Sequence, residues 1–119
     1  MATGVTFTAV RKLALALPGV EEGTSYGTPA FKVRGKLLAR LREDGETLAL
    51  RVGFDLRDLL MNAEPDTFYI TDHYRGYPYV LVRLPRVART RLREVLEEAW
   101  QQAAPKTLLA AHAPRKPDR

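Results

Sequence analysis

Residues 69–93 gather the side chains of this chain that best suit the binding of a ligand. The stretch holds four of the five tyrosines and one of the two histidines, and it ends in five arginines with no acid among them. Aromatic faces beside guanidinium groups suit a flat anionic ligand, because bases can stack while phosphates are neutralised. The residues predicted to bind nucleic acid or another anion are Tyr74, Arg75, Tyr77, Arg83, Arg86, Arg89 and Arg93.

The tyrosines of this stretch have two different predicted roles. Tyr74 and Tyr77 flank Arg75 in a loop rich in turn residues, so this tip suits entry into a groove or closure on a small ligand. Packing of the loop on itself is an equally good interpretation. Tyr69 and Tyr79 fall on predicted strands, where we expect them to oppose each other and to pack.

The arginines run from the end of a predicted strand into the first turns of a predicted helix. Cations near a helix N-terminus oppose the helix dipole by roughly 0.3–1 kcal/mol each, so helix stability does not explain their placement. Backbone N–H groups at a helix start, together with arginines, make an anion site. The alternative is a solvated face on which Arg91 and Arg93 pair with Glu94 and Glu97.

Catalytic chemistry finds little support in the sequence. Asp72 and His73 are the one conceivable acid–base pair, but neighbours on an extended chain point to opposite faces. Ser25 is the sole serine and lies in no nucleophile motif, and two histidines make no metal site by spacing. The absence of cysteine excludes zinc fingers, iron–sulfur centres and thiol nucleophiles. We therefore expect no enzyme, no metal and no cofactor.

The positive charge of the chain is concentrated in its tail. The net charge is +5, but residues 1–104 hold 15 basic and 13 acidic side chains, which leaves +2 for the body. Any basic footprint must therefore be local. The lack of cysteine, of a long apolar run and of a signal-like N-terminus predicts a soluble cytoplasmic protein with no membrane partner, and we expect a monomer.

The elements that must position these residues form one predicted α+β domain. Helical spacing of apolar residues indicates helices near residues 10–17, with threonine caps, and over residues 88–104, where Trp100 is expected in the core. Asp55 is expected to cap a short helix between the strands. Short alternating runs predict strands at residues 30–33, 36–42, 47–52, 68–71 and 79–84.

These elements predict a two-layer sandwich, in which an antiparallel β-meander sheet of about five strands has helices packed on one face. Pro29 favours an edge position for the first of these strands. We expect a single domain over residues 1–112, followed by a disordered basic tail over residues 113–119.

Four segments together resemble the MmcQ/YjbR family. They read LPGVEE at 17–22, PAFKV at 29–33, TDHYRGYPY at 71–79 and LEEAW at 96–100. The resemblance implies a compact α+β domain similar in topology to frataxin (CyaY-like) proteins, and a DNA-binding role through likeness of shape to double-wing domains. It carries over no catalytic residues. A frataxin-like iron role is not expected, because the first helix offers Arg11 and Lys12 in place of carboxylates.

Two functions remain open on this basis. The leading hypothesis is a non-enzymatic, double-wing-like module that binds double-stranded DNA through its hairpin tips and arginines. The alternative is a protein-interaction or small phosphorylated-ligand-binding domain. It would take an acidic protein partner or a small anion between the final helix and the loop that holds Tyr74 and Tyr77.

Overall fold

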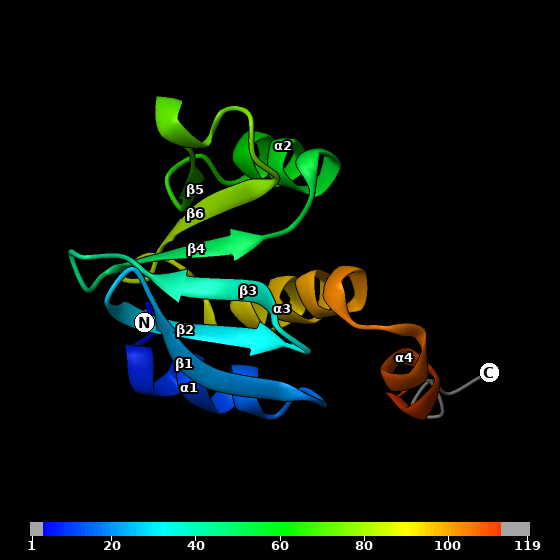
Figure 1. Ribbon diagram of the computed structural model, residues 1–119. Helices are drawn as coiled ribbons and strands as arrows, with labels where there is room; N and C mark the ends of the chain where they lie inside the picture. Colours follow the sequence, from blue (N-terminus) through cyan, green and yellow to red (C-terminus); the bar gives the residue numbers. More distant parts are fainter. Residues whose placement is uncertain (1–3, 113–119) are drawn as a thin grey trace.

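The computed structural model describes residues 4–112, and the predicted tail at 113–119 lies outside them. Its strands form one antiparallel sheet that is flanked by helices (Figure 1). The elements in chain order are α1 (Phe7–Leu15), β1 (Val20–Ser25), β2 (Thr28–Val33), β3 (Lys36–Leu41), β4 (Thr47–Arg51), α2 (Phe54–Ala63), β5 (Phe68–Tyr69), the 3₁₀ turn η1 (Asp72–Tyr74), β6 (Tyr79–Arg83), α3 (Arg89–Ala103) and α4 (Lys106–His112).

The sheet has six strands in the order β1-β2-β3-β4-β6-β5. The predicted α+β class and antiparallel sheet are confirmed, but the sheet is not a simple meander, since β6 inserts between β4 and β5. The prediction that β2 forms the edge was wrong, because β1 pairs along its whole length and places Thr24 opposite Pro29. Most of β1 is exposed, so it lacks the apolar alternation that marks a strand in a sequence.

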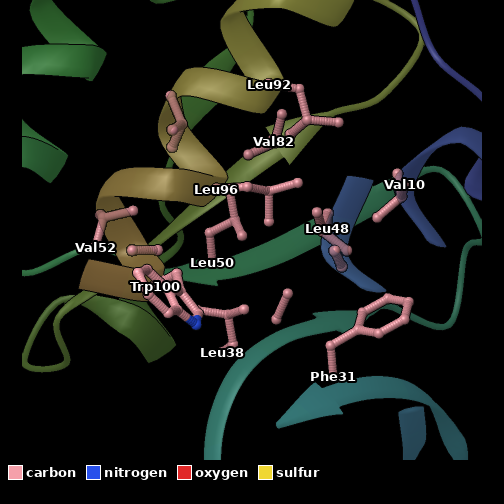
Figure 2. Packing of buried hydrophobic residues seen from close by; sticks show 14 of the residues in the cluster. Val10, Phe31, Leu38, Leu48, Leu50, Val52, Val82, Leu92, Leu96 and Trp100 are labelled. Carbon is pink, nitrogen blue, oxygen red and sulfur yellow. The ribbon is translucent and has the colours of Figure 1, made fainter. Parts of the chain in front are cut away.

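One face of the sheet is covered by α1 and α3 (Figure 1). The main core lies between these helices and the sheet. Figure 2 shows Leu96 and Trp100 of α3 in one cluster with the β4 side chains Leu48 and Leu50. The indole N–H of Trp100 donates to the carbonyl oxygen of Pro18 at 2.8 Å. The predicted core position of Trp100 is confirmed, and its one polar atom is satisfied.

The N-termini of α1 and α2 begin with different kinds of residue. Thr6 caps α1 as expected, since its hydroxyl accepts the N–H of Ala9 at 3.2 Å. Asp55 does not cap α2, because the helix begins two residues earlier than expected, after Gly53. Gly53 has φ 85° and ψ 160°, a conformation almost restricted to glycine, and its N–H donates to the carbonyl of Pro78.

Within residues 4–112, no α-helix packs on the opposite face of the sheet. Because side chains alternate along a strand, Ala49 of β4 and Leu81 of β6 point away from the core, and they form a second apolar cluster with Tyr74. Tyr74 belongs to η1, so the chain between β5 and β6 folds over part of this face. We call this side of the sheet the uncovered face.

No helix among residues 4–112 has the length and apolar character needed to cross a membrane.

Candidate binding site on the uncovered face of the sheet

A pocket of about 510 Å³ opens on the uncovered face, between the sheet, the β1–β2 turn and the η1 loop. Its floor includes Leu37 and Ala49, and the polar side chains Arg40 and Glu43 lie on its wall. Its aromatic lining is Tyr26, His73, Tyr74, Tyr77 and Tyr79. Mainly aromatic walls with a few polar groups are typical of a site for a small, flat ligand.

The η1 loop, residues 71–78, gives its two tyrosines different environments. Tyr74 is only 9% exposed and lies on the second apolar cluster, with its ring centre 6.2 Å from that of Tyr79. Tyr77 is 54% exposed, and its ring centre is 6.0 Å from that of His73. Tyr74 is therefore a wall of the pocket rather than a free tip, while Tyr77 is available to a ligand.

Arg57 of α2 binds the backbone of the η1 loop. Its Nη1 donates to the carbonyl oxygens of Tyr74, Arg75 and Tyr77, at 3.3, 3.1 and 3.1 Å. Its guanidinium carbon also lies 4.9 Å from the ring centre of Phe54, and the residue is 9% exposed. A buried cation that binds three backbone carbonyls fixes the loop, because charge-assisted hydrogen bonds are strong. The carbonyls of Tyr74 and Tyr77 also accept backbone N–H groups, so the Arg75 carbonyl depends most on Arg57.

Arg40 reaches the other side of the pocket from β3. Its Nη1 donates to the hydroxyl of Thr28 at 2.8 Å and lies 3.4 Å from a carboxylate oxygen of Glu43. Its guanidinium carbon lies 5.3 Å from the ring centre of Tyr26. Arg40 is 8% exposed, so its charge is held in one place by these contacts.

Tyr26 occupies an unusual backbone position. It has φ 53°, and Gly27 after it has φ 80°, which makes a type I′ turn between β1 and β2. Asparagine or glycine suits the first position of this turn, and a bulky aromatic residue there is uncommon. The side chain is 87% exposed, so burial does not explain its presence. A strained, exposed aromatic at a pocket rim points to ligand contact.

Electrostatics keep the polar lining in defined protonation states. The pKa of Glu43 is lowered, first by a hydrogen bond from its own backbone N–H and then by the charge of Arg40. Burial raises the pKa of the Tyr79 phenol, against the charge of Arg51. At neutral pH the pocket therefore offers an ionised carboxylate as acceptor and a neutral phenol as donor.

Two more arginines contact tyrosines on this face. The guanidinium carbon of Arg83 lies 3.9 Å from the ring centre of Tyr69, and its Nη1 donates to the carbonyl oxygen of Asp66. That of Arg42 lies 5.5 Å from the ring centre of Tyr74. The Nε of Arg42 is buried and has no hydrogen-bond partner among the described residues.

The prediction that Tyr69 and Tyr79 oppose each other was wrong. In the sheet Tyr69 lies opposite Leu81, and Tyr79 lies opposite Arg51. β6 pairs with β4 on one side and with β5 on the other, so its residues face partners in two strands. The patterns of the individual strands did not reveal this arrangement. Tyr79 lines the pocket, whereas Tyr69 holds Arg83.

The structure brings together only part of the predicted anion-binding set. Tyr74 and Tyr77 meet at the pocket, and Arg75 lies beside them, where its Nη2 pairs with Asp72 at 2.6 Å. Arg83 lies farther along the same face. Arg86 lies beyond the other end of β6, roughly 13 Å of strand away from the loop, and Arg89 and Arg93 are exposed on α3.

The start of α3 is partly neutralised. Arg91 pairs with Glu94, as the solvated-face alternative expected, and also with Glu64 at the end of α2, at 3.0 and 2.7 Å. The predicted cleft between the final helix and the η1 loop is not formed, because α3 covers the opposite face of the sheet. The loop instead closes on the sheet itself.

The candidate acid–base pair is divided between two environments. Asp72 pairs with Arg75, whereas the His73 ring meets Tyr74 edge-on, with ring centres 5.0 Å apart. Within residues 4–112, no group of three His, Asp or Glu side chains is placed to hold a metal ion.

Sequence reasoning missed Tyr26, Arg40, Glu43 and Arg57. The partners of Arg57 are backbone carbonyls 17 to 20 residues away, which leave no mark in the sequence. A signal in the sequence was present for two of the others, Tyr26 and Arg40. Tyr26-Gly27 reads as a tight hairpin turn, and Arg40 interrupts an apolar run in β3.

An α+β domain with one covered and one uncovered sheet face, and an aromatic pocket on the latter, defines the class of this protein. The YjbR family model matches residues 15–102, and the chain belongs to this family. All residues of the pocket fall within the matched range.

Relatives of known sequence give no function. The chain is 38% identical over 68 residues to the uncharacterized proteins Mb2600 of Mycobacterium bovis and Rv2570 of Mycobacterium tuberculosis. The match covers 56% of this chain and 53% of each relative, so the chain spans about half the length of the curated relatives it matches.

The fold is shared with a solved structure. The crystal structure of Deinococcus radiodurans protein DR2400, a DUF419 domain, matches with a TM-score of 0.69 over 82% of this chain and 77% of that chain. The two sequences are 24% identical, so this likeness shows a common fold.

Proposed function

We propose that this protein is a non-enzymatic DNA-binding module that presents the uncovered face of its sheet to the nucleic acid. The observation that carries the proposal is the repeated pairing of arginine with tyrosine on this face. The pairs are Arg40 with Tyr26, Arg42 with Tyr74 and Arg83 with Tyr69. Aromatic rings hold the guanidinium groups in place, so phosphates meet charges that are already ordered.

The charge of the uncovered face supports the same proposal. Among residues 4–112, the sheet register, the pocket and the side-chain contacts place five basic side chains there against three acidic ones. The basic set is Lys32, Arg40, Arg42, Arg51 and Arg83, and the acidic set is Glu21, Glu43 and Asp44. A local excess of positive charge beside exposed aromatic rings is the footprint of nucleic-acid binding.

The start of α3 is the competing surface. There Arg91 is engaged by two glutamates, which weakens the positive field around Arg89 and Arg93. We therefore propose that phosphates contact the uncovered face near Arg83, and not the start of α3.

Fluorescence anisotropy with labelled DNA across a salt series tests this proposal. We expect affinity to fall with salt, with a log–log slope of roughly 0.9 per phosphate contact for a duplex and roughly 0.7 for a single strand. Arg83→Gln should weaken binding and reduce this slope, whereas the matched control Arg93→Gln should change neither. Failure to bind DNA at low salt, or an effect of Arg93→Gln alone, would contradict the proposal.

The pocket itself favours a second candidate function, the binding of a small phosphorylated ligand. Its volume of about 510 Å³ lies in the range of roughly 300–1,000 Å³ typical of small-molecule sites. A thermal-shift screen of phosphorylated metabolites tests this candidate. A ligand at a hundred times its dissociation constant should add about 2.7 kcal/mol to the free energy of unfolding.

A further inference from the structure

We infer that the pocket on the uncovered face takes a single unpaired nucleobase, presented by a single-stranded nucleic acid or by a free nucleotide. The inference rests on the proposed function and names the group that this face recognises. Four observations carry it: the aromatic walls, the positions of the arginines, the Arg40–Glu43 pair and the exposure of Tyr77.

Tyrosine rings surround the pocket on several sides. Tyr79 rises from β6, Tyr74 and Tyr77 come from the η1 loop, and Tyr26 stands at the β1–β2 turn. A base can stack on such rings only after it has left the double helix, because neighbouring bases cover its faces in a duplex. The pocket therefore selects a flat group that is not already stacked.

The arginines that lie against the tyrosine rings disfavour a cationic occupant. A quaternary ammonium group also binds among tyrosine rings, but here Arg40 lies against Tyr26 and Arg42 lies against Tyr74. A second cation would meet the charge of Arg40, which has little exposure and lines the pocket. A neutral ring that carries a phosphate suits this environment better.

Arg40 and Glu43 provide a donor beside an acceptor. The Arg40 Nη1 lies 3.4 Å from a carboxylate oxygen of Glu43, and this exposed carboxylate keeps further lone pairs for a ligand. Guanine presents its O6 acceptor next to the N1–H and N2–H donors, so one base edge matches both side chains. The pair therefore predicts a preference for guanine over adenine, whose edge offers one donor for the carboxylate.

Tyr77 is the residue best placed to close on a bound base. It is 54% exposed, its ring lies near that of His73, and the Arg57 bonds fix the backbone carbonyl of the same residue. Removal of this ring costs the fold little, because more than half of the surface of Tyr77 is already in solvent.

The test compares a labelled ten-nucleotide strand that contains one guanine with its duplex, and with the mononucleotides GMP and AMP, by anisotropy and competition. We expect the single strand to bind at least about tenfold more tightly than the duplex, and Tyr77→Ala to weaken it by about tenfold. Leu59→Ala on α2, another exposed apolar side chain, is the matched control and should have no effect. Glu43→Gln should reduce the preference for guanine.

The outcomes separate this inference from the proposed function. If duplex and single strand bind equally and Tyr77→Ala has no effect, the inference is overturned while DNA binding stands. If GMP competes as tightly as the whole strand binds and the duplex does not bind, the base site stands, a free nucleotide is its source, and the DNA-binding proposal fails. If neither strand nor mononucleotide binds at low salt, both are overturned.

Discussion

Arg57 donates a hydrogen bond from its Nη1 to the carbonyl oxygen of Tyr77 at 3.1 Å, across 20 residues of sequence. This contact joins the first turns of α2 to the loop that walls the pocket. The same nitrogen also donates to the carbonyl oxygens of Tyr74 and Arg75. A single side chain of α2 therefore positions the loop that lines the pocket on the uncovered face.

Replacement of Arg57 should therefore damage the pocket before it damages the sheet. Arg57→Met keeps the apolar stem but removes the donor of the Arg75 carbonyl, while the carbonyls of Tyr74 and Tyr77 keep the backbone N–H groups of Tyr77 and Tyr79. We expect a loss of about 1–3 kcal/mol in the free energy of unfolding. Hydrogen–deuterium exchange should rise most in residues 71–78. Asp58→Ala is the control, because Asp58 is largely exposed and its ion pair with Arg57 contributes about 0–1 kcal/mol. If hydrogen–deuterium exchange in the Arg57 variant rises equally across the sheet and residues 71–78, this role of Arg57 is contradicted.

Tyr26 should prove more important for binding than for stability. Tyr26→Asn relieves an unfavourable turn position but removes the contact with Arg40, and these effects are each of about 0.5–1 kcal/mol, so we expect little net change on urea unfolding. Nucleic-acid affinity should fall. Arg34→Asn, at the equivalent position of the β2–β3 turn with φ 51°, is the matched control, and it should stabilise the fold without loss of affinity. A large loss of stability in Tyr26→Asn would mean that Tyr26 is retained for the fold.

The turn that carries Glu43 should depend on pH through Asp44. Its carboxylate accepts the N–H of Glu46 at 2.8 Å, the N–H of Thr47 at 2.9 Å and the Thr47 hydroxyl at 2.7 Å. The hydrogen bond from Glu46 is the first cause of its lowered pKa, followed by those from Thr47. Because the folded pKa lies below the unfolded value of 3.8, the stabilisation is present above that value and is lost as pH falls through the folded pKa.

Urea unfolding from pH 7 to about pH 2.5 checks this sign. The parent chain should be more stable than Asp44→Asn at neutral pH by about 1 kcal/mol, and the difference should shrink as the pH falls below about 4. If the difference in the free energy of unfolding between the two proteins stays constant over this range, the charge of Asp44 does not stabilise the turn.

The helical layer was predictable because its signals are local and periodic. The apolar face of α3, which includes Trp100, repeats at helical spacing, and Thr6 lies directly before α1. β1 was missed for the opposite reason, since an edge strand with four exposed residues has no apolar alternation to read. The position of β6 was hidden as well, because strand order depends on contacts distant in sequence.

The pocket was only half predictable. The loop tyrosines were visible as a motif, but whether Tyr74 turned inward depended on Ala49 and Leu81, which belong to two different strands. Arg40 and Tyr26 meet because the β1–β2 turn and β3 lie side by side in the sheet. Such a site is made by topology, and residue types alone show only some of its members.

Binding of nucleic acid to the uncovered face of the sheet can be mapped by NMR chemical shifts, with a ten-nucleotide single strand titrated into the labelled protein. We expect the largest shifts at Tyr26, Arg40, Tyr77 and Tyr79, with smaller ones near Arg83. Shifts confined to Arg89 and Arg93 on α3, with the pocket silent, would contradict it.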